Sequence, residues 1–371
     1  MRVIIAAAGT AGHINPGIAI ANKIKEEQSD SEIIFIGTER GLENDLVPRA
    51  GYKLKTIDAY GLSKKISITN FKNMFKTLKG LGQAKKIVKD FKPDIIIGTG
   101  GYICGATILA GKKNNIPTIL HESNAHPGKA VRMLSKKVDK ILLGFEEAAN
   151  KLEVKDKLVV TGTPVKIKDL KLTEVQKEQK LKQLALSPNK PLILVFGGSQ
   201  GAKKINDTII EIIKQKLNTS YQIMWATGPN QYDVIKNQLK EEDIDIDTLT
   251  GIKIVPYIYN MEEIMNIASI LVCRSGAMTV TEIARLGKAA IFIPLPNVSE
   301  NHQEHNARVL EKLGAARVIL NSELNETTLN DNINSILSSK QNLEQMGINA
   351  RMLNISNVED KIYDEIEKLI K

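Results

Sequence analysis

Short, unbroken aliphatic runs recur along the chain, and most are followed by glycine and then by a segment with helical periodicity. The runs are residues 3–7, 33–36, 95–97, 118–120, 158–160, 192–196, 223–225, 270–273 and 291–293. Runs without polar alternation are typical of strands that are buried on both faces of a sheet. Because they alternate with helical segments, they predict an α/β protein with doubly wound, parallel sheets.

The strand and helix pattern restarts in the middle of the chain. A length of 371 residues is long for one hydrophobic core, which stops growing at about 250–300 residues. Residues 161–164 read Thr-Gly-Thr-Pro, and the charged stretch 166–190 after them holds no strand candidate. We therefore expect two Rossmann-like domains that face a cleft, residues 1–163 and residues 164–354.

Each half opens with a strand, a glycine-rich turn and a helix. The turns are residues 8–13, Ala-Gly-Thr-Ala-Gly-His, and residues 197–201, Gly-Gly-Ser-Gln-Gly. Such a turn lets the backbone approach a phosphate, and the helix after it offers unpaired N–H groups. Neither turn matches the dinucleotide or the P-loop pattern, which disfavours both of those classes. A plain tight turn is the alternative for each, and finding two favours phosphate binding.

Polar residues of the first half should gather at the carboxyl ends of its strands. A third glycine cluster, residues 98–101, follows one strand, and Glu122 and Asn124 follow the next. We expect His13 to open toward the same crevice. A helix-start histidine bonded to a neighbouring turn is the alternative for His13, although its place in a glycine loop favours function. His121, at the end of its strand, is expected to be a core residue.

The second half carries a comparable segment at residues 273–282. Ser275 or Gly276 can cap the helix that begins here, and its first N–H groups suit a diphosphate. Glu282 lies about one turn into the helix, where it either accepts hydrogen bonds from ribose hydroxyls or interacts with the helix dipole. The polar residues 300–306 fit sugar hydroxyls and a solvated helix start equally well.

The acidic and sulfur-containing residues do not indicate a metal site. Asp243, Asp245 and Asp247 alternate with isoleucine before a strand, which favours a solvated edge over a cation site. We therefore expect no metal and no other cofactor, and leaving-group charge would be stabilised by N–H groups, helix dipoles and basic side chains. Cys104 and Cys273 are expected as buried thiols in a reducing compartment.

The formal net charge of +9 suggests an anionic partner, and the excess lysine is concentrated in residues 64–89. The lysines there are Lys64, Lys65, Lys72, Lys76, Lys79, Lys85, Lys86 and Lys89. The apolar residues at helical spacing among them are Phe71, Met74, Phe75 and Leu78. This pattern predicts either a basic amphipathic helix on an anionic membrane surface or a helix that packs in the core with solvated lysines. Nucleic acid is disfavoured because the basic region is one short helix with few aromatics.

No segment is expected to cross a membrane. The longest uncharged run, residues 3–22, is interrupted by glycine, histidine, asparagine and proline, so it predicts a strand, a loop and a helix start.

Taken together, these segments resemble the MurG family, bacterial transferases that add N-acetylglucosamine to undecaprenyl-linked N-acetylmuramyl-pentapeptide. The matching motifs are residues 9–13 with Pro16, 98–102, 121–124, 197–202, 274–277 and 302–303. The resemblance implies the GT-B fold, with a C-terminal helix at about 355–371 that packs back on the first domain. It also implies an acceptor and membrane domain at residues 1–163, a UDP-N-acetylglucosamine-binding domain at residues 164–354, and peripheral attachment to the cytoplasmic face of the cell membrane.

The resemblance also assigns donor-binding residues. They are Thr10, Ala11, Gly12, Asn124, Lys166, Ser199 for the diphosphate, Ile258 for uracil, Ala277, Met278, Thr279, Val280 and Thr281 for the diphosphate and nucleoside, Glu282 for the ribose and Gln303 for the sugar hydroxyls. The family usually has glycine at the position of Ala11 and arginine at that of Lys166. The lysine cannot make the bidentate contact of a guanidinium.

The expected reaction is an inverting transfer to the C4 hydroxyl of the lipid-linked acceptor, lipid I. A base removes the hydroxyl proton as the oxygen attacks the anomeric carbon of the donor, and helix N-termini stabilise the departing UDP. His13 is the expected base, and Glu122 is the alternative. Two other functions stay open: a non-hydrolysing UDP-sugar epimerase of the same architecture, and a nucleotide-binding module without chemistry.

Overall fold

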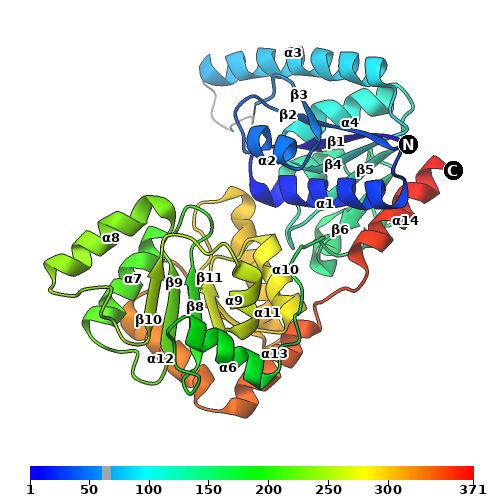
Figure 1. The fold of residues 1–371 in the computed structure, drawn as a ribbon. Helices are drawn as coiled ribbons and strands as arrows, with labels where there is room; N and C mark the ends of the chain where they lie inside the picture. Colours follow the sequence, from blue (N-terminus) through cyan, green and yellow to red (C-terminus); the bar gives the residue numbers. More distant parts are fainter. Residues whose placement is uncertain (61–67) are drawn as a thin grey trace. The chain divides into compact units, whose positions relative to one another are not determined.

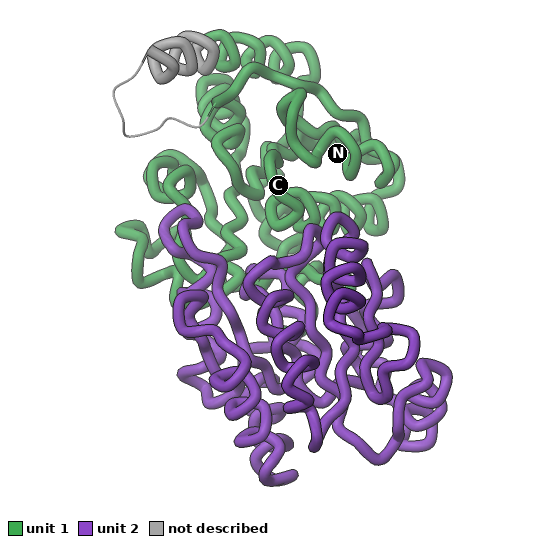
Figure 2. The backbone as a smooth tube through the Cα atoms, turned by 90° about the vertical axis from the view of Figure 1, so that its left-hand side faces the viewer, with its two compact units in different colours: residues 1–166, 355–371 green, residues 167–354 purple. Residues whose placement is uncertain are grey.

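The computed structural model describes residues 1–60 and 68–371, except for the side chains of residues 68–78. The described chain forms two compact units (Figure 2). Unit 1 comprises residues 1–166 and 355–371, and unit 2 comprises residues 167–354.

Unit 1 is built on a parallel seven-stranded sheet in the order β3-β2-β1-β4-β5-β6-β7 (Figure 1). The strands are β1 (Arg2–Ala7), β2 (Glu32–Gly37), β3 (Lys53–Thr56), β4 (Ile95–Gly100), β5 (Thr118–Glu122), β6 (Lys140–Leu143) and β7 (Leu158–Val160). The helices are α1 (Ala11–Glu27), α2 (Glu43–Arg49), α3 (Ile68–Phe91), α4 (Ile103–Lys113), α5 (Lys129–Leu134), the 3₁₀ helix η1 (Glu146–Lys151) and α14 (Val358–Ile370).

Helices cover both faces of this sheet. In β1, Val3 and Ile5 pack in one buried cluster with α1 and α14, whereas Ile4 and Ala6 pack in another with α3 and α4 (Figure 1). Successive side chains of a strand point to opposite faces, so every residue of a strand between two helical layers must be apolar. This accounts for the unbroken aliphatic runs, and it confirms the predicted doubly wound fold.

The chain returns to unit 1 through α14, which packs along α1. Lys23 Nζ lies 2.5 Å from Asp360 Oδ1, and Gln28 Nε2 donates a hydrogen bond of 3.0 Å to the Tyr363 hydroxyl. Ile362 is buried in the same cluster as β1. The last helix is therefore part of the core of unit 1.

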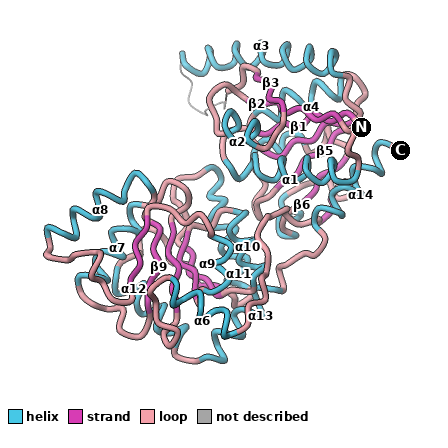
Figure 3. Tube along the Cα trace, in the orientation of Figure 1, coloured by secondary structure: helices cyan, strands magenta, loops and turns pink. Residues whose placement is uncertain are grey.

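Unit 2 repeats the design with a sheet flanked by helices (Figure 3). The sheet is parallel and six-stranded, in the order β10-β9-β8-β11-β12-β13. The strands are β8 (Leu192–Phe196), β9 (Gln222–Ala226), β10 (Ile252–Val255), β11 (Ile270–Cys273), β12 (Ala289–Phe292) and β13 (Ala316–Val318). The helices are α6 (Glu174–Gln183), α7 (Lys203–Lys214), α8 (Pro229–Glu241), α9 (Met261–Ile267), α10 (Ala277–Leu286), η2 (Ser299–Asn301), α11 (His302–Lys312), α12 (Glu326–Leu337) and α13 (Lys340–Arg351).

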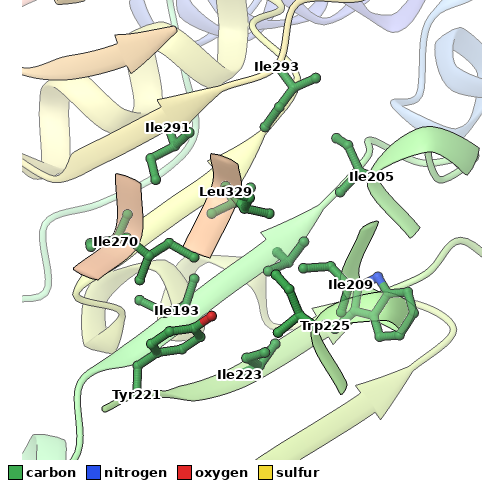
Figure 4. Close-up of a cluster of buried hydrophobic side chains, with 14 of the residues drawn as sticks. Ile193, Ile205, Ile209, Tyr221, Ile223, Trp225, Ile270, Ile291, Ile293 and Leu329 are labelled. Carbon is green, nitrogen blue, oxygen red and sulfur yellow. The ribbon is translucent and has the colours of Figure 1, made fainter. Parts of the chain in front are cut away.

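The core of unit 2 contains the only tryptophan of the sequence. Trp225 of β9 is fully buried beside Ile193 of β8 and Ile205 and Ile209 of α7 (Figure 4). Its indole N–H donates to Asn206 Oδ1 at 3.0 Å. The buried polar atom is thus paired, as a stable core requires.

The lysine-rich segment is only partly described. The residues whose side chains lie outside the described part are Lys64, Lys65, Phe71, Lys72, Met74, Phe75, Lys76 and Leu78. In the rest of α3, Ala84 and Val88 are buried in a cluster with α4, and Lys79 Nζ lies 2.8 Å from Asp58 Oδ2. This part of α3 packs in the core, and its contact with a membrane stays a prediction. No helix of the described chain is long and apolar enough to cross a bilayer.

Candidate active site

Most of the predicted motifs lie at the carboxyl ends of neighbouring strands. In unit 1, β1, β4 and β5 are adjacent, so residues 8–13, 98–102 and 121–124 share one edge of the sheet. In unit 2, β8, β11 and β12 are adjacent, so residues 197–201, 274–277 and 293–303 share the corresponding edge. Ligands of open α/β sheets bind at this edge.

His13 lies in the first turn of α1, half-buried, with its ring oriented by the preceding loop. Its Nδ1 is 3.1 Å from the carbonyl oxygen of Ala8. A carbonyl oxygen only accepts hydrogen bonds, so Nδ1 carries the proton and the lone pair of the neutral ring is on Nε2. The hydrogen bond to a neighbouring turn that is expected of a helix-start histidine is therefore present. The same hydrogen bond selects the tautomer in which Nε2 can accept a proton.

The third glycine cluster makes room for this imidazole. Gly100 and Gly101 have φ angles of +133° and +83°. A Cβ atom on Gly100 would overlap Cδ2 of the His13 ring, and one on Gly101 would lie 2.8 Å from Ala8 O. Thr99 Oγ1 also donates to His13 O at 2.7 Å. Residues 98–101 thus surround the first turn of α1, a role that their spacing did not reveal.

Glu43 supports the first glycine loop, a role that the sequence pattern does not indicate. Its Oε2 accepts a hydrogen bond of 2.9 Å from Gly9 N, and its Oε1 accepts from Thr38 N at 2.9 Å and Thr38 Oγ1 at 2.7 Å. Complete burial alone would raise the pKa of Glu43, but these hydrogen bonds lower it below its usual value. The Gly9 N–H is therefore used within the protein, and the unpaired donors of this loop begin at α1.

The replacement of the family's usual glycine by Ala11 causes no backbone strain. Ala11 is the first residue of α1, and it is absent from the residues with positive φ. Thr10 is the N-cap, with φ of −114° and ψ of 156°, and Gly12 follows within the helix. The N–H groups of this first turn point out of the helix end, where an anion is stabilised.

Glu122 is buried, and both of its oxygens are occupied. Oε1 accepts from Asn124 N at 2.9 Å and Asn124 Nδ2 at 3.0 Å, and Oε2 accepts from Gly128 N at 2.7 Å. Burial raises the pKa of Glu122, while these bonds oppose the rise. The carboxylate thus organises residues 124–128, a geometry that favours His13 over Glu122 as the base.

His121 is a core residue, as the sequence predicts. It is 1% exposed, with Nε2 3.1 Å from Gly162 O and Nδ1 3.3 Å from Ser123 Oγ. Burial lowers the pKa of His121 to about 4. The ring is therefore neutral at physiological pH.

The glycine loop of unit 2 is held by the loop after β9. Gly201 has a φ of +75°, and a Cβ atom there would overlap Thr227 O. Asn206 Nδ2 donates to the same Thr227 oxygen at 2.8 Å. Gly201 therefore has a packing role, whereas Ser199 is exposed at the tip of the loop.

The N-terminus of α10 leaves N–H groups available to an anion. Gly276 is its N-cap, without a side-chain hydrogen bond, and the first bond of the helix runs from Val280 N to Gly276 O at 3.0 Å. The N–H groups of Ala277, Met278 and Thr279 therefore have no acceptor within the helix. Of the two predicted caps, Gly276 is right and Ser275 is wrong.

Two of the predicted contact residues on α10 are occupied inside the protein. Val280 is fully buried, and Thr281 Oγ1 donates to Ala277 O at 2.9 Å. Their side chains therefore contribute to the helix and its packing.

Glu282, the sixth residue of α10, is a largely buried carboxyl group. Burial raises the pKa of Glu282 to about 7, and no described residue makes a hydrogen bond or ion pair with it. A carboxylate stabilised by a helix N-terminus would have a lowered pKa. The carboxyl group of Glu282 therefore has no partner among the described residues and is available to a ligand's hydroxyls.

Gln303 is oriented by two hydrogen bonds at the start of α11. Its Oε1 accepts from Leu295 N at 2.9 Å, and its carbonyl oxygen accepts from Ser275 Oγ at 2.8 Å. The amide NH₂ is therefore the part of the side chain that remains for a ligand. Asn306 is fully buried and donates to Ser275 O at 3.2 Å, so the solvated-helix interpretation is wrong at this position.

Arg274 holds the loop between β12 and α11, another role that the sequence did not reveal. Its Nη1 donates to Ile293 O at 2.9 Å, Pro294 O at 3.1 Å and Asn321 Oδ1 at 3.0 Å. Burial lowers the pKa of Arg274, but the group stays charged. The start of α10 and the loop that leads to Gln303 are thus fixed to each other.

The remaining predicted residues are more peripheral. Ile258 is 3% exposed, so its main chain rather than its side chain is available to the uracil ring of a nucleotide. Lys166 is exposed at the last residue of the first segment of unit 1. Asp243, Asp245 and Asp247 are exposed, while the isoleucines between them pack against the core, as expected of a solvated edge.

The two halves of the chain match the two domains of one enzyme family. Residues 3–143 match the glycosyltransferase family 28 N-terminal domain, and residues 192–362 match its C-terminal domain.

Relatives and solved structures agree with this match. The chain is 44% identical over 372 residues to the UDP-N-acetylglucosamine–N-acetylmuramyl-(pentapeptide) pyrophosphoryl-undecaprenol N-acetylglucosamine transferase of Acetivibrio thermocellus, covering 100% of this chain and 99% of the relative. It resembles the crystal structure of Acinetobacter baumannii MurG with a TM-score of 0.79 and 29% identity, over 99% of both chains. A UDP-GlcNAc 2-epimerase from Neisseria meningitidis shares the fold, with a TM-score of 0.64 and 18% identity over 99% of this chain and 100% of the other. The chain therefore belongs to the MurG family of glycosyltransferases, with the GT-B fold.

Proposed function

We propose that this chain transfers N-acetylglucosamine from UDP-N-acetylglucosamine to the C4 hydroxyl of N-acetylmuramic acid in undecaprenyl-pyrophosphoryl-MurNAc-pentapeptide. This step converts lipid I to lipid II in peptidoglycan synthesis. The relatives that are 44% identical over the whole chain are named for this transfer. The observation that carries the proposal is the carboxyl group of Glu282, which has no partner among the described residues and lies on the helix whose N-terminus is open to a diphosphate.

The donor contacts follow from unit 2. The N–H groups of Ala277, Met278 and Thr279 face the diphosphate, where the helix dipole also stabilises negative charge. Glu282 accepts hydrogen bonds from the ribose hydroxyls, and the NH₂ of Gln303 donates to hydroxyl oxygens of the sugar. The hydrogen bonds from the α10 N–H groups become stronger as negative charge develops on the departing UDP.

The other donor contacts rest on the family resemblance and on exposure. Ser199 presents its hydroxyl to the diphosphate, and the main chain of Ile258 contacts uracil. The remaining positions assigned to the donor are Thr10, Ala11, Gly12, Asn124, Lys166, Val280 and Thr281. The side chains of Val280 and Thr281 are occupied, and Val280 N bonds to Gly276 O, so these two residues hold the helix end that meets the donor.

His13 is the general base of the proposed reaction. Its Nε2 lone pair removes the proton of the acceptor C4 hydroxyl, whose oxygen bonds to the anomeric carbon as the bond to the diphosphate oxygen breaks. The electron pair of that bond leaves with UDP, and a single displacement inverts the anomeric configuration, giving a β-1,4 linkage. Ala8 and the two glycines at Gly100 and Gly101 hold the ring for this step.

The acceptor is lipid-linked, so the enzyme works at a membrane surface. We propose that it binds the cytoplasmic face of the cell membrane through the lysine-rich region of residues 64–89, without spanning the bilayer. Support comes from the net charge of +9 and the concentration of lysine in this segment.

The test is to incubate the chain with UDP-N-acetylglucosamine, with and without the lipid-linked acceptor, and to measure released UDP and the sugar products. Acceptor-dependent release of UDP with a matching amount of disaccharide-lipid is expected. Epimerised sugar without acceptor would favour an isomerase, and donor binding without UDP release would favour a binding module.

A further inference from the structure

Unit 2 contains a cavity of about 690 Å³ at the amino ends of its strands, opposite the donor edge. Helices α6 and α13 form its two sides, and the segments that enter β8, β11 and β12 form its floor. Binding sites for small organic molecules typically enclose about 300–1,000 Å³. The cavity is therefore large enough for a ligand, and no residue assigned to the donor or acceptor lines it.

Lys288 is the charged group on the floor of this cavity. Its Nζ donates to Asn266 O at 2.6 Å and to Ala268 O at 2.9 Å. An ammonium group has three donors, so one N–H is not used by these carbonyls. No carboxylate within the described residues forms an ion pair with Lys288.

The charges around Lys288 leave its own charge uncompensated. Burial and then the nearby charge of Lys177 lower the pKa of Lys288 to about 8, with Arg351 acting in the same direction and Asp169 and Glu174 opposing it. Both acidic groups have other partners. Glu174 lies 2.7 Å from Lys177 Nζ, and Asp169 lies 2.9 Å from Arg351 Nη2.

The wall formed by α13 is held rigidly. Arg351 donates to Arg285 O at 3.1 Å and Leu286 O at 2.9 Å. A Cβ atom on Gly287 would overlap the Arg351 guanidinium, and one on Gly347 would lie 2.6 Å from Gly287 O. The close packing at these glycines fixes the cavity wall beside Lys288.

Apolar side chains share the lining with polar and charged ones. The apolar residues that line the cavity are Leu181, Pro188, Pro191, Leu192, Ile267, Ala268, Ala289, Leu343 and Ile348. The carboxylates of Glu178 and Glu344 lie on exposed residues at the rim. A ligand that fits this arrangement has an anionic group for Lys288 and an apolar portion for the surrounding walls.

We propose that this cavity is a second binding site, for a small molecule that carries a phosphate or carboxylate group next to an apolar portion. The site goes beyond the transferase activity and does not rest on it. The anion accepts the remaining N–H of Lys288, and the apolar portion lies between Leu181 of α6 and Leu343 of α13. Because the donor edge lies at the other end of the same strands, UDP and this ligand bind at the same time.

The test is isothermal titration calorimetry with phenyl phosphate, inorganic phosphate and phenol as probes, each in the presence of saturating UDP so that the donor site is occupied. Phenyl phosphate is expected to bind with a stoichiometry of one, more tightly than either of the other probes. Phenylacetate, a carboxylate of similar shape, is expected to compete with phenyl phosphate. This competition would show that the site accepts either a phosphate or a carboxylate group. Two variants probe the cavity: Lys288→Met removes the charge, and Leu343→Trp fills the space without touching Lys288. Lys240→Met, on exposed α8, is the control.

A charge-assisted hydrogen bond contributes roughly a factor of ten or more to affinity. Lys288→Met and Leu343→Trp are each expected to weaken phenyl phosphate binding about tenfold or more, while Lys240→Met and UDP binding stay unchanged. If Lys288→Met does not fold, Leu343→Trp decides the question alone. Equal affinity in wild type and Leu343→Trp overturns the proposal, as does inorganic phosphate binding as tightly as phenyl phosphate.

Discussion

Replacing Glu282 by glutamine tests whether this carboxyl group is buried without a partner in the free protein. Burial raises its pKa from 4.5 to about 7, and a pKa difference of one corresponds to about 1.36 kcal/mol of free energy. The folded state holds the proton more tightly than the unfolded state, so stability is lost as pH rises through about 7. Glutamine keeps the shape and removes this loss.

The stability gap should therefore depend on pH. We expect Glu282→Gln to exceed wild type in free energy of unfolding by under about 1 kcal/mol at pH 5 and by about 3 kcal/mol at pH 8. Urea unfolding followed by fluorescence is a selective assay, because Trp225 is the only tryptophan and is buried in the same unit as Glu282. The control is Glu241→Gln, at an exposed position at the end of α8.

A gap that is the same at both pH values would refute the assignment of a raised pKa to Glu282. A less stable variant at pH 8 would show that the carboxylate has a partner within the protein. The same variant tests the donor site, because ribose hydroxyls donate to the ionised carboxylate. UDP affinity of wild type should rise between pH 6 and 8, and Glu282→Gln should bind roughly tenfold or more weakly, without this pH dependence.

Three further changes test other parts of the account. Gly100→Ala should lower kcat strongly with little change in the donor KM, because the new Cβ overlaps the imidazole of His13, the proposed base. Gly51→Ala, also at positive φ but with no atom within 4 Å of the added Cβ, should leave kcat unchanged. Glu122→Gln should cost about 1–3 kcal/mol of stability, because the NH₂ group of the glutamine must face an N–H donor in either orientation. The fall in rate at acidic pH should remain in this variant, because it arises from protonation of the proposed base, His13. Lys72→Glu with Lys76→Glu should reduce sedimentation with anionic vesicles.

Each of these has a result that contradicts it. A normal kcat in Gly100→Ala would mean that the position of the His13 imidazole does not matter for the reaction. The melting temperature of this variant is measured as well, so that a misfolded protein can be told from a folded protein with a displaced imidazole. A rate that no longer falls at acidic pH in Glu122→Gln would make Glu122 the base. Unchanged vesicle sedimentation would assign the lysine-rich segment to core packing, and Lys236→Glu with Lys240→Glu, at exposed positions four residues apart on α8, is the matched charge control.

The fold was predictable because its signal is local. The aliphatic run of β1 has no polar position, since Val3 and Ile4 enter cores on opposite faces of the sheet. A glycine after an aliphatic run marks the end of a strand. Because the carboxyl ends of parallel strands lie at one edge of the sheet, the motifs that follow these strands could be assigned to that edge. Such patterns need only a few consecutive residues.

The supporting contacts were not predictable, because they join residues far apart in the chain. Glu43 reads as an ordinary acidic residue in a first helical turn, and its role depends on Gly9 and Thr38. Gly100 is needed because of a ring that belongs to a different helix. Serine is a residue type that commonly caps helices, yet the Ser275 hydroxyl donates to the carbonyl oxygen of Gln303 at the start of α11 instead. The lack of a protein partner for the Glu282 carboxyl group among the described residues likewise depends on which distant residues surround it.

The most direct test of the proposed reaction is the transfer of radiolabelled N-acetylglucosamine to the lipid-linked acceptor by wild type and His13→Ala, with donor and acceptor both saturating. We expect wild type to form labelled disaccharide-lipid in a β-linkage with one UDP released for each sugar. His13→Ala should lose about 100-fold or more in rate, the contribution typical of a general base, while it still binds UDP. Near-normal turnover by His13→Ala would contradict the proposed base, and absence of labelled lipid product with wild type would contradict the transferase itself.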